Sequence, residues 1–142
     1  FKFCRMRNIL IVGAGKSSPY LIKYLLDKSQ EQNLYLNITD VTIDHLLHHK
    51  KNNRCTVSTI NILNDKEREE YLLKNDIIIS MLPARLHMIL ANSCLKLKKN
   101  LITASYVSDE MRGISRSVKD RNLIFLNEMG LDPGIDHMSA KK

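Results

Sequence analysis

The chain has 142 residues, 44% of them hydrophobic and 26% charged, which is typical of one globular domain with a sizeable core. No apolar run approaches the length of a membrane span, and the first residues contain no signal-peptide pattern, so neither a membrane protein nor secretion is indicated. The net charge of +7 comes from scattered Lys and Arg without interleaved aromatic residues, which argues against nucleic-acid binding.

Three cysteines, Cys4, Cys55 and Cys94, lie far apart in the chain. Their spacing suits neither a disulfide framework nor a zinc site, and it favours a reducing, cytoplasmic environment. Because Met6 lies directly before the first predicted strand, we interpret residues 1–6 as a possible extension and residues 7–142 as one domain.

Short apolar segments alternate with amphipathic ones along the chain. The predicted strands are residues 8–12, 34–39, 55–60, 76–80, 101–103 and 123–126. The predicted helices are residues 19–28, 43–51, 65–73, 86–97 and 108–120, with Pro19 in the first turn of one and Ser108 as the N-cap of another. Several strands are nearly continuous Ile, Leu and Val, as in parallel sheets that are buried on both faces. The alternation predicts an α/β domain of the Rossmann type, a doubly wound parallel sheet of six strands with helices on both faces.

A glycine loop, Gly13-Ala14-Gly15-Lys16-Ser17-Ser18, follows the first predicted strand and precedes a helix. It resembles the dinucleotide-binding fingerprint with its third glycine replaced by Ser18, where a small residue suffices for helix packing. Gly13 would permit the tight turn, and Gly15 would let the backbone approach a pyrophosphate at the helix N-terminus. A P-loop is excluded because Leu10 occupies the position of its first glycine. A turn that binds no cofactor remains the alternative.

Asp40 ends the second predicted strand, 25 residues after Gly15. A carboxylate at this place can accept both ribose hydroxyls of NAD, and no arginine follows closely to bind a 2′-phosphate. The alternative is that Asp40 caps a helix that begins near Thr42.

Histidines occur in two further places. His87 follows the segment Ser80-Met81-Leu82-Pro83 and could contact a ligand, although a partly exposed structural role is the more common one. In the cluster His45, His48 and His49, only His45 and His49 have the i, i+4 spacing of metal ligands, and no third ligand lies nearby. We therefore interpret the cluster as a solvated face and expect no metal.

The segment 127–138, Asn-Glu-Met-Gly-Leu-Asp-Pro-Gly-Ile-Asp-His-Met, contains the densest group of functional residue types. Asp132 and Pro133 predict a helix start, with Asp132 as the N-cap. An ordinary capped turn would explain Asp132-Pro133-Gly134. It would not explain Glu128, Asp136 and His137 around it, so we expect a functional loop.

Together, residues 13–20, 80–87, 103–111 and 127–138 resemble the N-terminal part of saccharopine dehydrogenase, most closely its glutamate-forming type, also called saccharopine reductase. The resemblance covers essentially all of residues 7–140. It implies an NAD(P)-dependent oxidoreductase of lysine metabolism that interconverts saccharopine with glutamate and 2-aminoadipate semialdehyde. A hydride is transferred at a C–N bond.

The resemblance also implies roles for particular residues. The implied cofactor-binding residues are Ala14, Gly15, Lys16, Ser17, Thr39, Asp40, Val41, Ser80, Met81, Leu82 and Pro83, to which the glycine fingerprint adds Gly13 and Ser18. The implied saccharopine-binding residues are Ser105, Tyr106 and Asp132. The general acid or base is not assigned.

The chain departs from this family in two respects. Members of the glutamate-forming type largely use NADP, whereas Asp40 favours NAD. The family also continues with a substrate-binding and dimerising domain, so the full enzyme is expected to be a homodimer and this chain a fragment, a truncated product or one half of a split enzyme. Two alternatives stay open: an imine reductase similar to carboxynorspermidine or homospermidine synthase, or a non-catalytic dinucleotide-binding module.

Overall fold

The computed structural model describes residues 5–140, so most of the proposed extension at residues 1–6 lies outside the described part. The described chain folds around one parallel sheet of six strands in the order β3-β2-β1-β4-β5-β6. The strands are β1 (Arg7–Val12), β2 (Leu34–Asp40), β3 (Cys55–Thr59), β4 (Ile77–Ser80), β5 (Asn100–Thr103) and β6 (Phe125–Leu126). The predicted six-stranded parallel sheet is confirmed.

Helices cover both faces of this sheet, as predicted. The helices are α1 (Pro19–Lys28), η1 (Asp44–Lys51), α2 (Asp65–Leu73), η2 (Ala84–Leu86), α3 (His87–Leu97), α4 (Asp109–Gly113), α5 (Ser115–Asp120) and α6 (Ile135–Ser139), where η denotes a 3₁₀ helix. Alternate side chains of β1 point to opposite faces, which divides the core into two layers. Ile9 and Ile11 pack with α1 and η1, whereas Leu10 and Val12 pack with α2, α3 and α4.

The local start signals for two helices are confirmed. Pro19 occupies the first turn of α1. The Ser108 side chain accepts a hydrogen bond from the Met111 amide at 3.1 Å and thereby caps α4.

Two helix predictions were wrong in detail. The segment 108–120 forms two short helices, because α4 ends at Gly113 and α5 begins at Ser115. Asp132 does not cap α6, which begins at Ile135 after Gly134. The backbone of Gly134 has φ 148° and ψ −95°, which no helix permits, and its amide donates to Asp136 Oδ1 at 2.9 Å.

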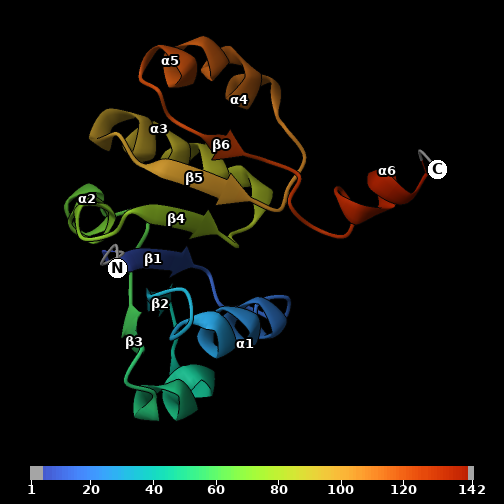
Figure 1. Cartoon of the computed structure of the whole chain (residues 1–142). Coiled ribbons are helices and arrows are strands. Elements are labelled where there is room, and N and C mark those ends of the chain that lie inside the picture. Colours follow the sequence, from blue (N-terminus) through green and yellow to red (C-terminus); the bar gives the residue numbers. More distant parts are fainter. Residues whose placement is uncertain (1–4, 141–142) are drawn as a thin grey trace.

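The strand order places β1 beside β4 at the centre of the sheet. From β1 the chain continues toward β2, and from β4 it continues toward β5, so the carboxyl ends of β1 and β4 flank a topological switch point. Ligands of open parallel sheets bind in the crevice at such a point. Figure 1 shows α6 projecting beyond the carboxyl ends of these strands.

Candidate functional site

The glycine loop lies at the switch point, directly against the loop that follows β4. Gly13 has φ 91°, and a Cβ atom there would lie 2.9 Å from the carbonyl carbon and oxygen of Met81. Gly13 is therefore required by the close approach of the two loops. A Cβ atom on Gly15 would meet no atom within 4 Å, so the fold leaves open space above Gly15.

Ser18 closes the loop from below. Its side chain is buried, and its hydroxyl donates to the Gly15 carbonyl at 2.8 Å. The neighbouring residues Gly15, Lys16 and Ser17 are exposed. The loop therefore presents the backbone of Gly15, the cationic side chain of Lys16 and the short side chain of Ser17 to solvent at the N-terminal end of α1, which suits a pyrophosphate.

Asp40 holds the glycine loop from the end of β2. Its Oδ2 accepts from the Ala14 amide at 2.5 Å, and its Oδ1 accepts from the Val41 amide at 2.6 Å. It caps no helix: η1 begins at Asp44, with Ile43 at its N-cap. Each carboxylate oxygen can accept more than one hydrogen bond, so a ribose hydroxyl could still bind there.

Two further residues fix the loop. Thr39 is fully buried; its hydroxyl donates to the Ile11 carbonyl at 2.9 Å, and its carbonyl accepts from the Gly13 amide at 2.9 Å. His45 Nε2 lies 2.8 Å from the Ala14 carbonyl oxygen, which can only accept. His45 was interpreted as part of a solvated face, and its contact with the loop was missed because 31 residues separate the partners.

A cavity of about 560 Å³ opens between these loops. Its walls come from the carboxyl ends of the four strands β1 to β4 and from the segments after them. The lining includes Gly13, Gly15, Ser17, Asp40, Val41, Met81, Leu82 and Pro83, together with Ile60, Ile62 and Leu86. Most of the predicted cofactor-binding residues thus surround one cavity, which has apolar walls and an acid at its rim.

A second cavity of about 330 Å³ adjoins the first and shares Ser17, Met81 and Leu82 with it. The predicted substrate-binding residues Ser105, Tyr106 and Asp132 line this cavity. They come from two loops that follow β5 and β6.

Backbone contacts align these two loops. The amides of Glu128 and Met129 donate to the carbonyls of Ser105 and Thr103, both at 3.1 Å. Glu128 Oε1 also accepts from the Val107 amide at 3.2 Å. Glu128 therefore has a positioning role at the start of the loop.

Tyr106 and Asp132 are joined by a short hydrogen bond in which the phenol donates to Oδ1. This bond to a carboxylate raises the pKa of Tyr106 to about 12. The phenol therefore stays protonated at neutral pH. Asp132 is exposed, and its other oxygen is free of this bond and can face a cationic group.

His87 lines the same cavity and is more buried than its position in the sequence predicts. A partly exposed position was expected, but its side chain is only 5% exposed. Nδ1 lies 2.8 Å from Ser80 Oγ, and Nε2 lies 2.7 Å from Ser105 Oγ. Burial lowers the pKa of His87, so the imidazole is neutral at neutral pH.

Asp132, Asp136 and His137 bring one potential ligand atom each within 4.8 Å of one another, the one such group among residues 5–140. Asp132 lies in the exposed loop, whereas Asp136 and His137 lie in the first turn of α6, and His137 Nε2 is 3.6 Å from Asp136 Oδ2. A metal site would normally enclose its ion with more ligands, and exposed acids often cluster without one.

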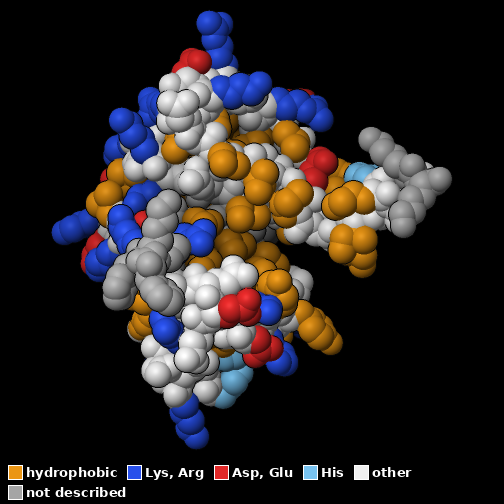
Figure 2. Space-filling view, in the orientation of Figure 1, with side chains coloured by type: hydrophobic (Ala, Val, Ile, Leu, Met, Phe, Trp, Pro, Cys, Tyr) orange, Lys and Arg blue, Asp and Glu red, His pale blue; other side chains and the backbone are white. Residues whose placement is uncertain are grey.

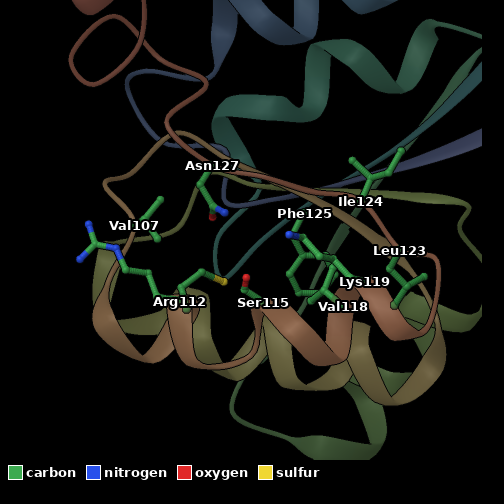
Figure 3. A pocket seen from close by; sticks show the side chains of 10 residues that line it. Val107, Arg112, Ser115, Val118, Lys119, Leu123, Ile124, Phe125 and Asn127 are labelled. Atoms are coloured by element: carbon green, nitrogen blue, oxygen red, sulfur yellow. The ribbon is translucent and has the colours of Figure 1, made fainter.

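Another cavity, of about 330 Å³, lies between β6 and the helices α4 and α5. Figure 3 shows Val118 and Phe125 at its centre and the Arg112 guanidinium directed away from it. Among residues 5–140 its lining is mainly apolar and includes no acid, so this cavity is less suited to an amine substrate than the two at the switch point.

Comparison with known proteins identifies the family. Residues 9–126 match the family described as saccharopine dehydrogenase NADP binding domain. The chain belongs to this family. The described part contains no helix that is long and apolar enough to cross a bilayer.

Individual relatives agree with this assignment. Mouse mitochondrial alpha-aminoadipic semialdehyde synthase is 32% identical over 135 residues, which are 94% of this chain and 14% of that protein. Saccharopine dehydrogenase [NADP(+), L-glutamate-forming] of Saccharomyces cerevisiae is 26% identical over 136 residues, 96% of this chain and 30% of the yeast protein. The apo structure of the glutamate-forming saccharopine dehydrogenase from that yeast superposes with a TM-score of 0.84 at 25% identity, covering 94% of this chain and 29% of that one. The chain thus spans less than a third of these relatives.

Proposed function

We propose that this chain is the nicotinamide-dinucleotide-binding part of an oxidoreductase, and that the dinucleotide binds in the 560 Å³ cavity. The observation that carries the proposal is the open space above Gly15. Packing accounts for the glycine at position 13 but not for the one at position 15. A bound pyrophosphate would account for it, since the backbone must approach the phosphate closely.

Asp40 favours NAD over NADP in this cavity. Its carboxylate lies at the rim, and none of the described residues that line the cavity is a lysine or an arginine. A 2′-phosphate would face an acid with no cation to neutralise it. The family name specifies NADP, so the coenzyme preference of this chain is a separate proposal that titration with both coenzymes decides.

The reaction that we propose is the interconversion of saccharopine with glutamate and 2-aminoadipate semialdehyde. When bound, a nicotinamide coenzyme would supply the hydride acceptor for oxidation at the carbon next to the secondary amine, and the nitrogen would lose a proton. Water then adds to the resulting imine, and the C–N bond breaks. The adjoining cavity supports this assignment, because its residues border the walls of the dinucleotide cavity.

Within that cavity, the residue types suit an amino-acid substrate. Asp132 would pair with the cationic secondary amine, and the neutral Tyr106 phenol would keep the carboxylate in place through their hydrogen bond. The Ser105 hydroxyl would bind a carboxylate. These groups orient the substrate, while the hydride chemistry belongs to the coenzyme.

A further domain would complete this site. Saccharopine has three carboxylates, yet among residues 5–140 no lysine or arginine lines the cavity that contains Ser105 and Asp132. Exposed apolar side chains, Leu131, Ile135 and Met138, lie on the loop and on α6 beside it. In Figure 2 apolar side chains gather on the projecting part of the molecule. A C-terminal domain would supply the cations, cover this surface and bring two subunits together as a homodimer.

The two alternative functions, imine reduction of the carboxynorspermidine or homospermidine type and dinucleotide binding without catalysis, would use the same cavity. The expected cytoplasmic location also stays a proposal; Cys55 and Cys94 are buried free thiols, which suits a reducing compartment.

Fluorescence titration of the purified chain with NADH and NADPH tests the proposal that the chain binds a nicotinamide dinucleotide. Absence of binding to either would overturn it.

A further inference from the structure

Three polar side chains form a continuous hydrogen-bonded chain beneath the substrate cavity. Ser80 at the end of β4 is fully buried, and its Oγ lies 2.8 Å from His87 Nδ1. His87 Nε2 lies 2.7 Å from Ser105 Oγ, and Ser105 is half-buried at the cavity wall. The chain therefore leads from the protein interior to a residue that can touch a ligand.

The surroundings of Ser80 determine the direction of this chain. Within residues 5–140, the Ser80 hydroxyl has no hydrogen-bond partner other than Nδ1. If Nδ1 carried the proton, the Ser80 proton would be buried without an acceptor, which is costly. Ser80 therefore donates to Nδ1, and a neutral imidazole then has its proton on Nε2.

The position of this proton determines the direction of the hydrogen bond between His87 and Ser105. Nε2–H donates to Ser105 Oγ, so the Ser105 proton cannot point back at the histidine. It has no other acceptor among the described residues and must point toward the cavity or its solvent. The serine is thereby presented as a donor.

We propose that Ser80 and His87 are positioning residues that fix Ser105 as a hydrogen-bond donor to a carboxylate of the substrate. The identity of the ligand rests on the proposed function, whereas the direction of the hydrogen bonds from Ser80 through His87 to Ser105 does not. Asp132 lines the same cavity as an acceptor, so Ser105 and Asp132 would bind the carboxylate and the amine of an amino acid and fix its orientation. The acid would meet the amine, and the serine would meet the carboxylate.

The tautomer of His87 tests the direction. Long-range ¹H–¹⁵N correlation spectra of the ¹⁵N-labelled chain at neutral pH should show His87 protonated at Nε2 and unprotonated at Nδ1. A His87→Gln variant assigns the signals among the five histidines. His45 is an internal reference, because its Nε2 lies 2.8 Å from a carbonyl oxygen and must donate. An Nδ1–H tautomer of His87 would overturn the proposal.

In two variants, the pKa of His87 should shift in opposite directions. A histidine with a purely structural role would not show this pattern. Ser80→Ala removes a donor to the neutral ring and should raise the pKa of His87 by roughly 0.5 unit. Ser105→Ala removes an acceptor from Nε2–H and should lower that pKa. If the hydrogen bonds ran in the opposite direction, the two pKa shifts of His87 would have the opposite signs. The charged groups that line cavities with His87, namely Arg85, Glu110 and Asp132, are the same in both variants.

A ligand measurement tests the donor role. L-Glutamate titrated into the NADH-saturated chain should shift the amide signal of Ser105, and Ser80→Ala should weaken this binding about fivefold. Equal binding by the two proteins, or no shift at Ser105, contradicts the proposal. NADH titration alone decides the dinucleotide assignment, so failure of one proposal is distinguishable from failure of the other.

Discussion

The amide of Ala14 donates to Asp40 Oδ2 at 2.5 Å, which ties the glycine loop to the end of β2. His45 binds the carbonyl of the same residue, so Ala14 is held at both of its backbone polar groups. The loop thus has its shape before a ligand arrives. Preformed sites lose less entropy on binding, which favours affinity.

Substitution of the two loop glycines should separate folding from binding. Gly15→Val should abolish NADH binding while the melting temperature changes little, because its side chain would enter open space that the pyrophosphate needs. Gly13→Val is the matched control. It should lower the stability by about 2 kcal/mol or more, since its Cβ would lie 2.9 Å from the Met81 backbone. Undiminished NADH binding by Gly15→Val would refute the phosphate assignment.

Asp40 should set the coenzyme preference. The unchanged chain is expected to bind NADH at least as well as NADPH, and Asp40→Asn should improve NADPH relative to NADH by about tenfold at low salt. An asparagine keeps an oxygen for the Ala14 amide but removes the charge. Asp44→Asn makes the same charge change at an exposed position four residues later and should leave the ratio unaltered. A clear preference of the unchanged chain for NADPH would contradict this prediction.

The Tyr106 phenol should lose its proton at a higher pH than an ordinary tyrosine does. Its hydrogen bond to Asp132 raises its pKa from 10.0 to about 12. Because the folded chain keeps this proton to higher pH than the unfolded chain does, the stability from the bond is complete below pH 10 and is lost as the pH rises toward 12.

Tyrosinate absorbance of the chain, minus that of Tyr106→Phe, measures this pKa directly. Asp132→Asn should move it back toward 10.0, since the carboxylate that disfavours ionisation is then absent. An unchanged midpoint in Asp132→Asn would show that Asp132 does not control the phenol.

The chain alone should not turn over saccharopine. Addition of the remaining C-terminal part of a relative, as a separate polypeptide, should restore NAD(P)-dependent saccharopine oxidation. Asp132→Ala should then reduce the rate by about 100-fold or more while coenzyme binding persists. Asp27→Ala, at an exposed ion pair on α1, is the control and should retain activity. Robust oxidation by the isolated chain would disprove the need for a second domain.

Local sequence signals predicted much of the fold correctly. The bounds of α1 and α2 agree residue for residue with the predicted segments, because their start signals, Pro19 in the first turn of α1 and the Asn64 cap of α2, act within a few residues. The apolar strands likewise predicted the parallel sheet. The glycine loop could be recognised because a strand, a turn and a helix follow one another without interruption.

Other features depend on contacts between residues that are distant in sequence. Ser80 and Ser105 meet His87 only because β4 and β5 are neighbours in register, with Ser80 opposite Thr103. Similarly, Glu128 aligns the loop of Asp132 with that of Ser105 through hydrogen bonds across the ends of β5 and β6.

What the sequence by itself determined was therefore the class of fold and the types of chemical group at the switch point. The tertiary structure decided which of these groups are buried, which are paired and which remain open to a ligand. The burial of His87 and the open space above Gly15 illustrate this difference. Burial and hydrogen-bond direction depend on everything that packs around a side chain, and the neighbouring residues in the chain supply only part of that environment.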